Sequence, residues 1–309
     1  MTRWTSNEGF LTGGTGAIGR HLVPKLVAEG HKVTALVRSA EKAAQVERQG
    51  AVPAEVSLFD ADGLATAFEG HDAVINLATA IPSTSRYFLP GAWKSNFRIR
   101  TEGSAAVAKA ARSAGVGRLL QESVVFVYPD SGDKWIDESA ELDVVPSSEP
   151  NVAAEENARR FAEQGGVGVV LRFGYFYGPG GAIHTEEILK FARLRFAMQL
   201  GGRNAYQAAI HLEDAASAVV AALEIPSGTY NVCDDEPLTA REFTDAMIAA
   251  VGRRPLLRGP GRLLALGGNK TAALTRSQRV SNQRFKDAAN WSPHYPSARE
   301  GWAATVAAG

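Results

Sequence analysis

Three glycines near the start of the 309-residue chain have a spacing that suits a phosphate-bearing ligand. Gly13, Gly16 and Gly19 form a G-x-x-G-x-x-G pattern, which follows the apolar run "GFLT" and opens an apolar helical pattern. One such glycine allows a tight turn, another lets the backbone approach a pyrophosphate, and the last lets helix and strand pack closely. N–H groups at the helix N-terminus then face the anion. The motif therefore predicts a dinucleotide-binding turn.

A basic residue ends the second apolar run, where the ribose of such a ligand would lie. A carboxylate there would suit the 2′-hydroxyl of NAD. The sequence instead has Arg38, in "ALVRS", with no acid before Glu41. A guanidinium fork matches a 2′-phosphate, so the residue favours NADP, with NAD still possible. Arg20 adds a second cation near the turn.

Strands and helices must alternate to bring these residues to one edge of a sheet. Short β-like runs do alternate with helical patterns, such as the apolar face of Ile18, Leu22 and Leu26. This order indicates βαβ units and a mostly parallel sheet. We predict an α/β fold, a Rossmann-type doubly wound parallel sheet with a smaller C-terminal substrate lobe. The expected strands are "GFLT", "KVTALVR", "AEVSLF", "DAVINLA", "GRLLQESVVFVY" and "GVVLRFGYFYG".

The pattern of elements changes after "YGPGG". We predict that residues 1–178 form the NADP-binding domain, to which residues 205–228 return. Residues 179–204 and 229–309 are predicted to form the substrate-binding lobe.

Two local features predict details of individual helices. Pro24 lies inside the first predicted helix, where it removes a hydrogen bond; we expect a bend and not a break, because the apolar pattern continues past it. Thr239, followed three residues later by Glu242, predicts a capping box at the start of a later helix.

The chain resembles the extended short-chain dehydrogenases/reductases, which include epimerases and dehydratases. The resemblance rests on "TGGTGAIG", "DAVINLA", "VVFVY", "LRFGYFYGPGG", "IHLEDAA" and "GTYNVCDDEPLT". It implies a Rossmann domain, a substrate lobe, a nicotinamide cofactor and a homodimer. It also implies the cofactor-binding residues, which are Thr12, Gly13, Thr15, Gly16, Ala17, Ile18, Gly19, Arg38, Ser57, Leu58, Leu77, Ala78, Thr79, Phe173, Gly174 and Tyr175.

The catalytic half of the family pattern is missing. The family uses a tyrosine as acid/base, a lysine four residues later that lowers the tyrosine pKa, and a serine or threonine. In the family an acid usually follows the lysine by four residues. Taking Glu156 in "VPSSEPNVAAEENARRF" as that acid puts Ser148 at the tyrosine and Val152 at the lysine, and a register shifted by one or two residues supplies neither a tyrosine nor a lysine. Val124 takes the place of the serine, and Arg100 that of an asparagine in the preceding helix. The chain therefore resembles an atypical branch of the family.

Other residues are candidates for the missing acid/base. We name Ser123, Tyr128 and Tyr175 as candidate catalytic residues. Tyr177, His184 and His211 are further candidates, although Tyr128, Tyr177 and His211 are more typical of residues with a structural role.

Four functions fit this sequence. The first is an NADP-dependent oxidoreductase, epimerase or dehydratase with a relocated acid/base, acting on a small hydroxyl, carbonyl or sugar-like metabolite. The second is an enzyme in which cofactor and shape suffice, because hydride transfer is the cofactor's chemistry. The third is a non-redox cyclase or isomerase, and the fourth an NADP-sensing regulator. The substrate is expected between loops 78–93 and 178–187, with Arg193, Arg195 and Arg203 as possible phosphate ligands.

The composition is that of a globular protein with a small-molecule substrate. Lys+Arg and Asp+Glu both total 33, so nothing in the charge balance favours nucleic acid or a membrane surface. No apolar run approaches 18 residues, which predicts no transmembrane helix. The histidines are scattered and no metal site is expected. One cysteine, Cys233, permits no internal disulfide and fits the cytoplasm.

Overall fold

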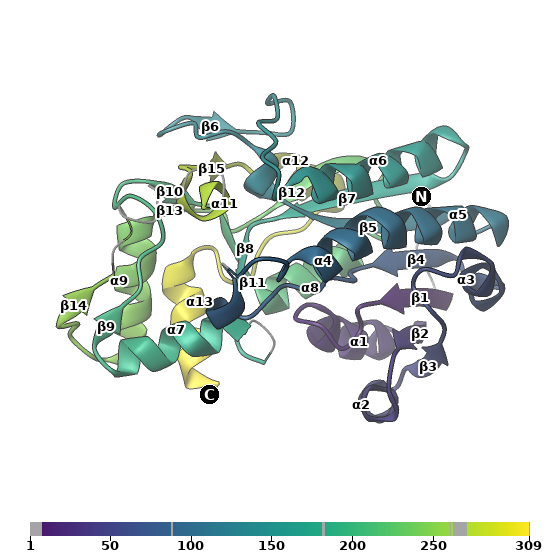
Figure 1. Cartoon of the computed structure of the whole chain (residues 1–309), viewed down its shortest axis with the longest axis horizontal. Helices are drawn as coiled ribbons and strands as arrows, with labels where there is room; N and C mark the ends of the chain where they lie inside the picture. The colour runs from purple at the N-terminus through teal and green to yellow at the C-terminus, as the bar shows by residue number, and fades with distance from the viewer. Residues whose placement is uncertain (1–7, 88, 181–182, 260, 262–270, 309) are drawn as a thin grey trace.

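A seven-stranded parallel sheet forms the centre of the molecule (Figure 1). The computed structural model describes residues 8–87, 89–180, 183–259, 261 and 271–308. The strand order β12-β7-β5-β4-β1-β2-β3 reverses direction at β1, as in a doubly wound fold, and every neighbouring pair is parallel. The predicted Rossmann-type α/β fold is therefore confirmed. The strands are β1 (Glu8–Thr12), β2 (Lys32–Val37), β3 (Val52–Glu55), β4 (Ala73–Asn76), β5 (Arg118–Val124), β7 (Val167–Phe173) and β12 (Gly228–Val232).

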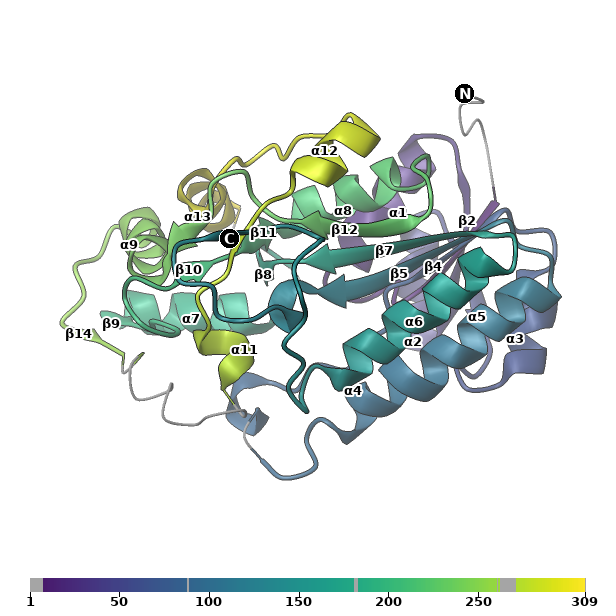
Figure 2. The same cartoon turned by 90° about the horizontal axis from the view of Figure 1, so that it is seen from above.

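Helices cover both faces of the sheet, which explains why its strands are apolar without alternation. On one face α3 (Ala61–Phe68), α5 (Ser104–Ser113) and α6 (Glu149–Glu163) lie side by side (Figure 2). Their apolar side chains, among them Phe68 and Phe161, pack against the sheet. On the other face lie α1 (Gly19–Ala28), α8 (Leu212–Ala221) and α12 (Gln283–Ala289). Helix α2 (Ala40–Arg48) packs beside β2 and β3.

Two helices contain local irregularities. Helix α1 runs through Pro24 without a break, as expected from its apolar pattern. Helix α4 (Lys94–Arg98) continues into α5 through a π-helical turn at Ile99–Gly103, which places Arg100 in that turn. Single π turns inside helices often occur at functional sites.

The C-terminal part of the chain builds a smaller lobe at the carboxyl ends of the strands. Its helices are α7 (Ile183–Arg193), α9 (Ala240–Val251), α11 (Ala272–Thr275) and α13 (Ala298–Ala307), and α9 packs on α13. Its short strands are β6 (Trp135–Ile136), β8 (Tyr175–Tyr177), β9 (Phe196–Ala197), β10 (Tyr206–Gln207), β11 (Ala209–His211), β13 (Leu238–Thr239), β14 (Leu257–Arg258) and β15 (Arg279–Val280). The division of the chain into two domains at the predicted boundaries stays a prediction.

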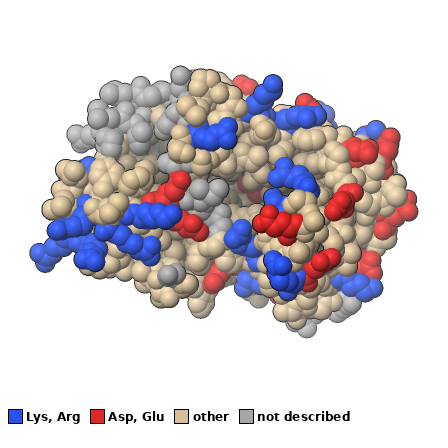
Figure 3. All heavy atoms as spheres, turned by 60° about the horizontal axis from the view of Figure 1, so that its bottom comes forward, with Lys and Arg blue, Asp and Glu red and all other residues tan. Residues whose placement is uncertain are grey.

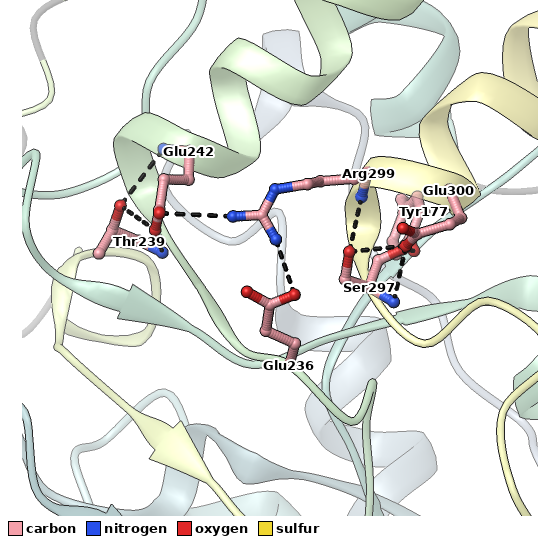
Figure 4. A network of polar contacts seen from close by, with 7 residues as sticks. All are labelled: Tyr177, Glu236, Thr239, Glu242, Ser297, Arg299 and Glu300. Atoms are coloured by element: carbon pink, nitrogen blue, oxygen red, sulfur yellow. Dashed lines mark hydrogen bonds and ion pairs between the residues drawn. The ribbon is translucent and has the colours of Figure 1, made fainter.

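Two capping boxes fix the start of α9 and of α13 (Figure 4). Thr239 and Glu242 form the predicted box on α9, and Ser297 and Glu300 form a second one on α13. Arg299 links the two helices, because its guanidinium donates to Glu236 at 2.7 Å and to Glu242 at 3.4 Å. The arrangement holds the two helices of the lobe in a defined orientation.

Candidate functional site

The glycine-rich turn between β1 and α1 has the close backbone contacts that its sequence predicts. Gly13 has a φ of 77°, and a Cβ there would lie 2.6 Å from the Leu77 carbonyl oxygen. A Cβ on Gly19 would lie 2.6 Å from the Gly14 backbone. No side chain caps the start of α1, where the Arg20 N–H donates to the Gly16 carbonyl and the Leu22 N–H to the Ile18 carbonyl. Such a cradle fits the pyrophosphate of a dinucleotide.

This turn forms one end of a cavity of about 920 Å³, within the range of small-molecule sites. Fourteen of the sixteen predicted cofactor residues line the cavity, and Thr12 and Phe173 do not. Thr12 is buried, where its hydroxyl donates to Asn76 at 2.5 Å, and the fully buried Phe173 packs on Phe176. The fourteen are Gly13, Thr15, Gly16, Ala17, Ile18, Gly19, Arg38, Ser57, Leu58, Leu77, Ala78, Thr79, Gly174 and Tyr175.

Two cationic side chains line the cavity at the end of β2, where the ribose of the cofactor is expected. Arg38 follows β2, and Lys42 lies on the first turn of α2, four residues later. Both side chains are available to an anion, since no acidic partner of either is found among the described residues. Sequence reasoning missed Lys42, although its position three residues after the Ser39 N-cap, on the first turn of α2, was a usable signal.

A buried hydrogen-bond network around Glu155 shows how α6 aligns with the family pattern. Glu155 is 8% exposed, and its carboxylate accepts hydrogen bonds from Arg172 at 2.6 and 2.9 Å and from Ser123 at 2.5 Å. Glu156 is instead paired with exposed Arg159 and Arg160. The buried acid of α6 is Glu155, which favours an alignment of this helix one residue earlier than the alignment on Glu156.

The alignment on Glu155 brings two other side chains to the cavity. Counting back from Glu155 places Asn151 at the family's lysine and Ser147 at its tyrosine, and both line the cavity. Neither Ser147 Oγ nor Asn151 Oδ1 has a hydrogen-bond partner among the described residues. Ser148 also borders the cavity, but its hydroxyl bonds the backbone of Val145. Val152, the lysine equivalent in the other alignment, is not part of the lining.

Of the three named catalytic candidates, the structure brings only Tyr175 to the cavity. Ser123 is fully buried on β5 and donates to Glu155. Tyr128 is also fully buried, where its hydroxyl donates to Asn231 at 2.9 Å and accepts from Arg172 at 2.8 Å. Both side chains therefore complete the network around Glu155 and Arg172.

Of the three further candidates, only His184 lines the cavity. Tyr177 is buried and donates to Asp234 at 3.1 Å. His211 is buried at the start of α8, where its Nδ1 accepts from the Glu213 N–H, and burial lowers its pKa to about 4. His184 lines the cavity, and burial lowers its pKa as well.

A buried ion pair forms part of the cavity wall beside β5. Arg100, in the π turn, lies 2.8 Å from the Glu122 carboxylate, and both side chains are 4% exposed. Burial raises the pKa of Glu122, and the Arg100 charge opposes this shift. The pair neutralises itself, so this wall contributes little net charge. Sequence reasoning named Arg100 only as a departure from the family and missed Glu122.

Aromatic side chains form the end of the cavity farthest from the ribose cations. Tyr87 and Trp93 pack edge to face with ring centroids 5.0 Å apart, and the Trp93 indole N–H donates to the Tyr87 carbonyl at 3.0 Å. Burial raises the pKa of Tyr87 to about 12 and raises that of Tyr175 as well. Both hydroxyls are therefore neutral at pH 7. The aromatic lining at this end comprises Tyr87, Trp93, Phe97, Phe126, Tyr175 and Phe176, and Phe59 lines the cavity beside Ser57 and Leu58.

The remaining predicted features lie away from this cavity. Arg193 and Arg195 are exposed at the end of α7, where basic side chains gather on the face in Figure 3, and Arg203 is exposed. Cys233 is buried, which raises its thiol pKa. Of the predicted loop 178–187, residues 181 and 182 lie outside the described residues.

Two other kinds of feature are absent from the described residues. No cluster of three or more His, Cys, Asp or Glu side chains in that part of the chain has the arrangement of a metal site. Within the same residues, no helix combines the length and apolar character needed to cross a membrane.

Comparisons with known proteins agree with this cavity. A family profile described as NAD(P)H-binding matches residues 13–165. The 3-diazoavenalumate denitrifying reductase of a Streptomyces species is 34% identical over 302 residues, which cover 94% of this chain and 98% of that protein. A 4-hydroxy-2-methyl-3-oxo-4-farnesyl-3,4-dihydroquinoline-1-oxide ketoreductase of Stigmatella aurantiaca is 26% identical over 251 residues, covering 79% of this chain and 73% of that protein.

Solved structures show the same architecture. The human epimerase family protein SDR39U1, crystallised with NADPH, has a TM-score of 0.81 and 25% identity, covering 97% of this chain and 99% of that chain. The UDP-glucose 4-epimerase of Thermotoga maritima has a TM-score of 0.80, with 97% of both chains covered. At 21% identity, this second likeness shows the fold alone.

Proposed function

This chain belongs to the extended short-chain dehydrogenase/reductase family, and on that premise we propose that it is an NADPH-dependent reductase of an atypical branch. The observation that carries the proposal is one continuous cavity, which joins a pyrophosphate cradle to an aromatic wall. A bound nicotinamide nucleotide supplies a hydride. The residues described here bind the nucleotide and hold the acceptor beside it.

The preference for NADPH over NADH rests on two cations. Arg38 and Lys42 lie on the same wall, at the end of β2 and the start of α2. A guanidinium fork and an ammonium group suit the 2′-phosphate of NADPH, whereas the 2′-hydroxyl of NADH is usually bound by a carboxylate. No acidic residue occupies positions 38 to 40.

The side chains of the cavity favour a hydride acceptor that requires no proton from the protein. Ser147 and Asn151 replace the family's tyrosine and lysine and do not titrate near neutral pH. Tyr87 and Tyr175 keep their protons, because burial raises the pKa of both hydroxyls. Burial lowers the pKa of His184, which also lines the cavity, so this imidazole carries no extra proton to donate at neutral pH. Glu122 is engaged by Arg100. A carbonyl acceptor would gain from a general acid, whose contribution is typically about 10²–10⁴-fold.

A diazo group, in its diazonium form, is an acceptor of the required kind. When a hydride is added to the carbon that bears the diazonium, a carbon–hydrogen bond forms, the carbon–nitrogen bond breaks, and dinitrogen leaves with the bonding electron pair. Charge and atoms balance without any proton transfer. The 34% identical relative is named for a denitrifying reduction of a diazo compound, which supports this class of substrate. The aromatic wall, with Trp93 and Phe126, suits the ring that would bear the group.

The proposal is tested by incubating the purified chain with NADPH and 3-diazoavenalumate. We expect loss of NADPH absorbance at 340 nm, together with a product that has lost two nitrogen atoms and gained one hydrogen, as measured by mass spectrometry. A reaction without protein corrects for direct reduction by NADPH. A Gly19→Val variant, whose side chain would overlap the Gly14 backbone, is expected to fall to that background. Reduction of a matched ketone with no reaction of the diazo compound would contradict the proposal.

The other open functions predict different results in the same assay. An epimerase would regenerate its cofactor and give no net loss of NADPH. A regulator would bind NADPH without turnover of any acceptor. We also propose that the protein is a cytoplasmic homodimer, which the family resemblance and the single Cys233 support; light scattering of the purified chain tests the dimer.

A further inference from the structure

Three leucine side chains project into solvent at one end of the smaller lobe. Leu194 directly follows α7 and is 76% exposed, and Leu256 and Leu257, at the start of β14, are 71% and 67% exposed. Phe191, on the last turn of α7, is also exposed, and its ring lies 6.0 Å from that of Phe196. Single exposed apolar residues are common on proteins, but a group of them at one place usually marks an interaction surface.

Backbone contacts hold together the two segments that carry these side chains. The Leu256 N–H donates to the Arg195 carbonyl at 2.8 Å, and β14 pairs with β9 in parallel register. Arg195 Nε donates in turn to the Arg254 carbonyl at 3.0 Å. Residues 191–197 and 253–258 therefore form one surface, which we call the lobe tip.

The lobe tip also carries an excess of positive charge. Four of its exposed arginines have no acidic partner among the residues that the structure describes, and these are Arg193, Arg195, Arg253 and Arg254. Arg258 differs, since it lies 2.5 Å from the Asp245 carboxylate. Basic side chains gather on the left of Figure 3, whereas both signs of charge mix on the right. A formal net charge of zero for the chain thus conceals a local basic surface.

This combination of side chains suits the surface of an anionic lipid bilayer. Arginine binds phosphate oxygens through a planar fork, and its carbon chain can lie along apolar surface while the charge stays at the headgroups. Projecting leucines can enter the boundary between headgroups and acyl chains, and binding strength rises with both contributions. Protein partners more often offer shaped pockets to aromatic or arginine anchors, among which leucine is under-represented. Leucines that stand out into solvent therefore favour a bilayer over an acidic protein.

We propose that the lobe tip binds the surface of an anionic phospholipid bilayer. Leu194, Leu256 and Leu257 enter the headgroup region, and the arginines around them bind lipid phosphates. The contact is peripheral and involves no spanning helix. None of the residues of the lobe tip lines the cavity, so the inference does not depend on the proposed reductase function. The average charge of the chain gave no sign of such a surface, because its acids and bases are unevenly distributed.

The test measures binding of the purified chain to lipid vesicles by co-sedimentation. Vesicles of equal parts phosphatidylcholine and phosphatidylglycerol should bind it more than about 100-fold more tightly than vesicles of phosphatidylcholine alone, because each basic residue near an anionic surface contributes about five-fold. Arg253→Gln combined with Arg254→Gln should therefore weaken binding to the anionic vesicles about 25-fold. Leu256→Ser combined with Leu257→Ser should weaken it about ten-fold, since less apolar surface enters the bilayer.

Matched controls separate the lobe tip from general effects of charge and apolar surface. Arg48→Gln combined with Arg112→Gln removes the same charge from exposed positions on α2 and α5. Val52→Ser removes a side chain that is 63% exposed on β3. Both controls should bind anionic vesicles as the wild type does. The dissociation constant of NADPH should be the same in all five proteins, which shows that each variant is folded.

The outcomes that oppose the inference are distinct. Failure of the wild type to bind anionic vesicles would overturn it, as would unchanged binding in either of the two lobe-tip variants. Poly-L-glutamate serves as a probe for an acidic protein partner. Binding to this polymer that requires Arg253 and Arg254, without binding to vesicles, would assign the lobe tip to an acidic protein and overturn the inference. The diazo assay contains no lipid, so its result is independent of all these outcomes.

Discussion

Replacing Glu155 by glutamine is expected to destabilise the protein severely while leaving its shape almost unchanged. The Glu155 carboxylate lies among three partners, accepting from Arg172 Nε at 2.9 Å, from Arg172 Nη2 at 2.6 Å and from Ser123 at 2.5 Å. The side chains of Glu155 and Arg172 are only 10% and 7% exposed. Glutamine has nearly the same size, so the substitution removes one charge and adds two N–H donors where only donors are present.

The magnitude follows from the charge that is left behind. Arg172 would keep its hydrogen bond to Tyr128 but would have no carboxylate in contact among the described residues. Breaking a buried ion pair by removing one partner typically costs about 3–5 kcal/mol. Because one amide oxygen can still accept a hydrogen bond from Arg172, we expect a loss near the lower end, roughly 3 kcal/mol.

The neighbouring Glu156→Gln variant is the matched control. Glu156 also accepts hydrogen bonds from arginines, but Arg159 and Arg160 are exposed to water. We expect this variant to lose only a small fraction of the Glu155→Gln effect, because water screens exposed pairs. Urea unfolding followed by circular dichroism measures both. Equal losses in the two variants would refute the assignment of Glu155 as the buried acid, and with it the alignment of α6 on Glu155.

Three further predictions concern the cavity and its surroundings. Asn151→Leu should raise the free energy of unfolding by about 1 kcal/mol, measured as a thermal midpoint roughly 2–4 °C higher, because it removes a buried amide oxygen that has no partner among the described residues; a lower midpoint would contradict this. Arg38→Ala should raise the dissociation constant of NADPH about ten-fold and leave that of NADH within two-fold, in a fluorescence titration; equal losses would oppose the role given to Arg38. Burial holds the pKa of His211 at about 4, below its ordinary 6.5, so the native state resists protonation and His211 contributes stability that is present above pH 6.5 and lost as the pH falls toward 4. The stability advantage of wild type over His211→Gln, measured by urea unfolding, should therefore shrink across that window, and a difference independent of pH would argue against it.

The fold and the nucleotide end of the cavity could be predicted because local sequence determines them. The first strand, the G-x-x-G-x-x-G turn and the apolar helix follow one another in the chain. The turn needs glycine at positions 13 and 19, because a Cβ there would meet the Leu77 or Gly14 backbone. The position of Arg38 could be predicted for the same reason, since the carboxyl end of a parallel strand lies at the ligand-binding edge of the sheet. The Thr239 capping box is likewise formed within four residues.

The acceptor end could be predicted only in part. Loop 78–93 lines the cavity as expected, but contacts between distant segments determine the rest of the wall. Two acids, Glu155 and Glu156, are adjacent in sequence, and only the packing of α6 against β7 shows that Arg172 pairs with the first. Arg100 and Glu122 are 22 residues apart and meet because a π turn shifts the helix by one residue. The buried positions of Ser123 and Tyr128 follow from the face of β5 and the turn after it, which composition does not reveal.

The measurement that tests the central claim most directly is the fate of the hydride in the diazo reaction. The reaction should be run in ordinary water with NADPH that carries deuterium at the transferred position of the nicotinamide. We predict that the product carries one deuterium on the carbon that lost dinitrogen, located by NMR. A product that gains this hydrogen from water, with no deuterium from the nucleotide, would contradict hydride transfer in this cavity.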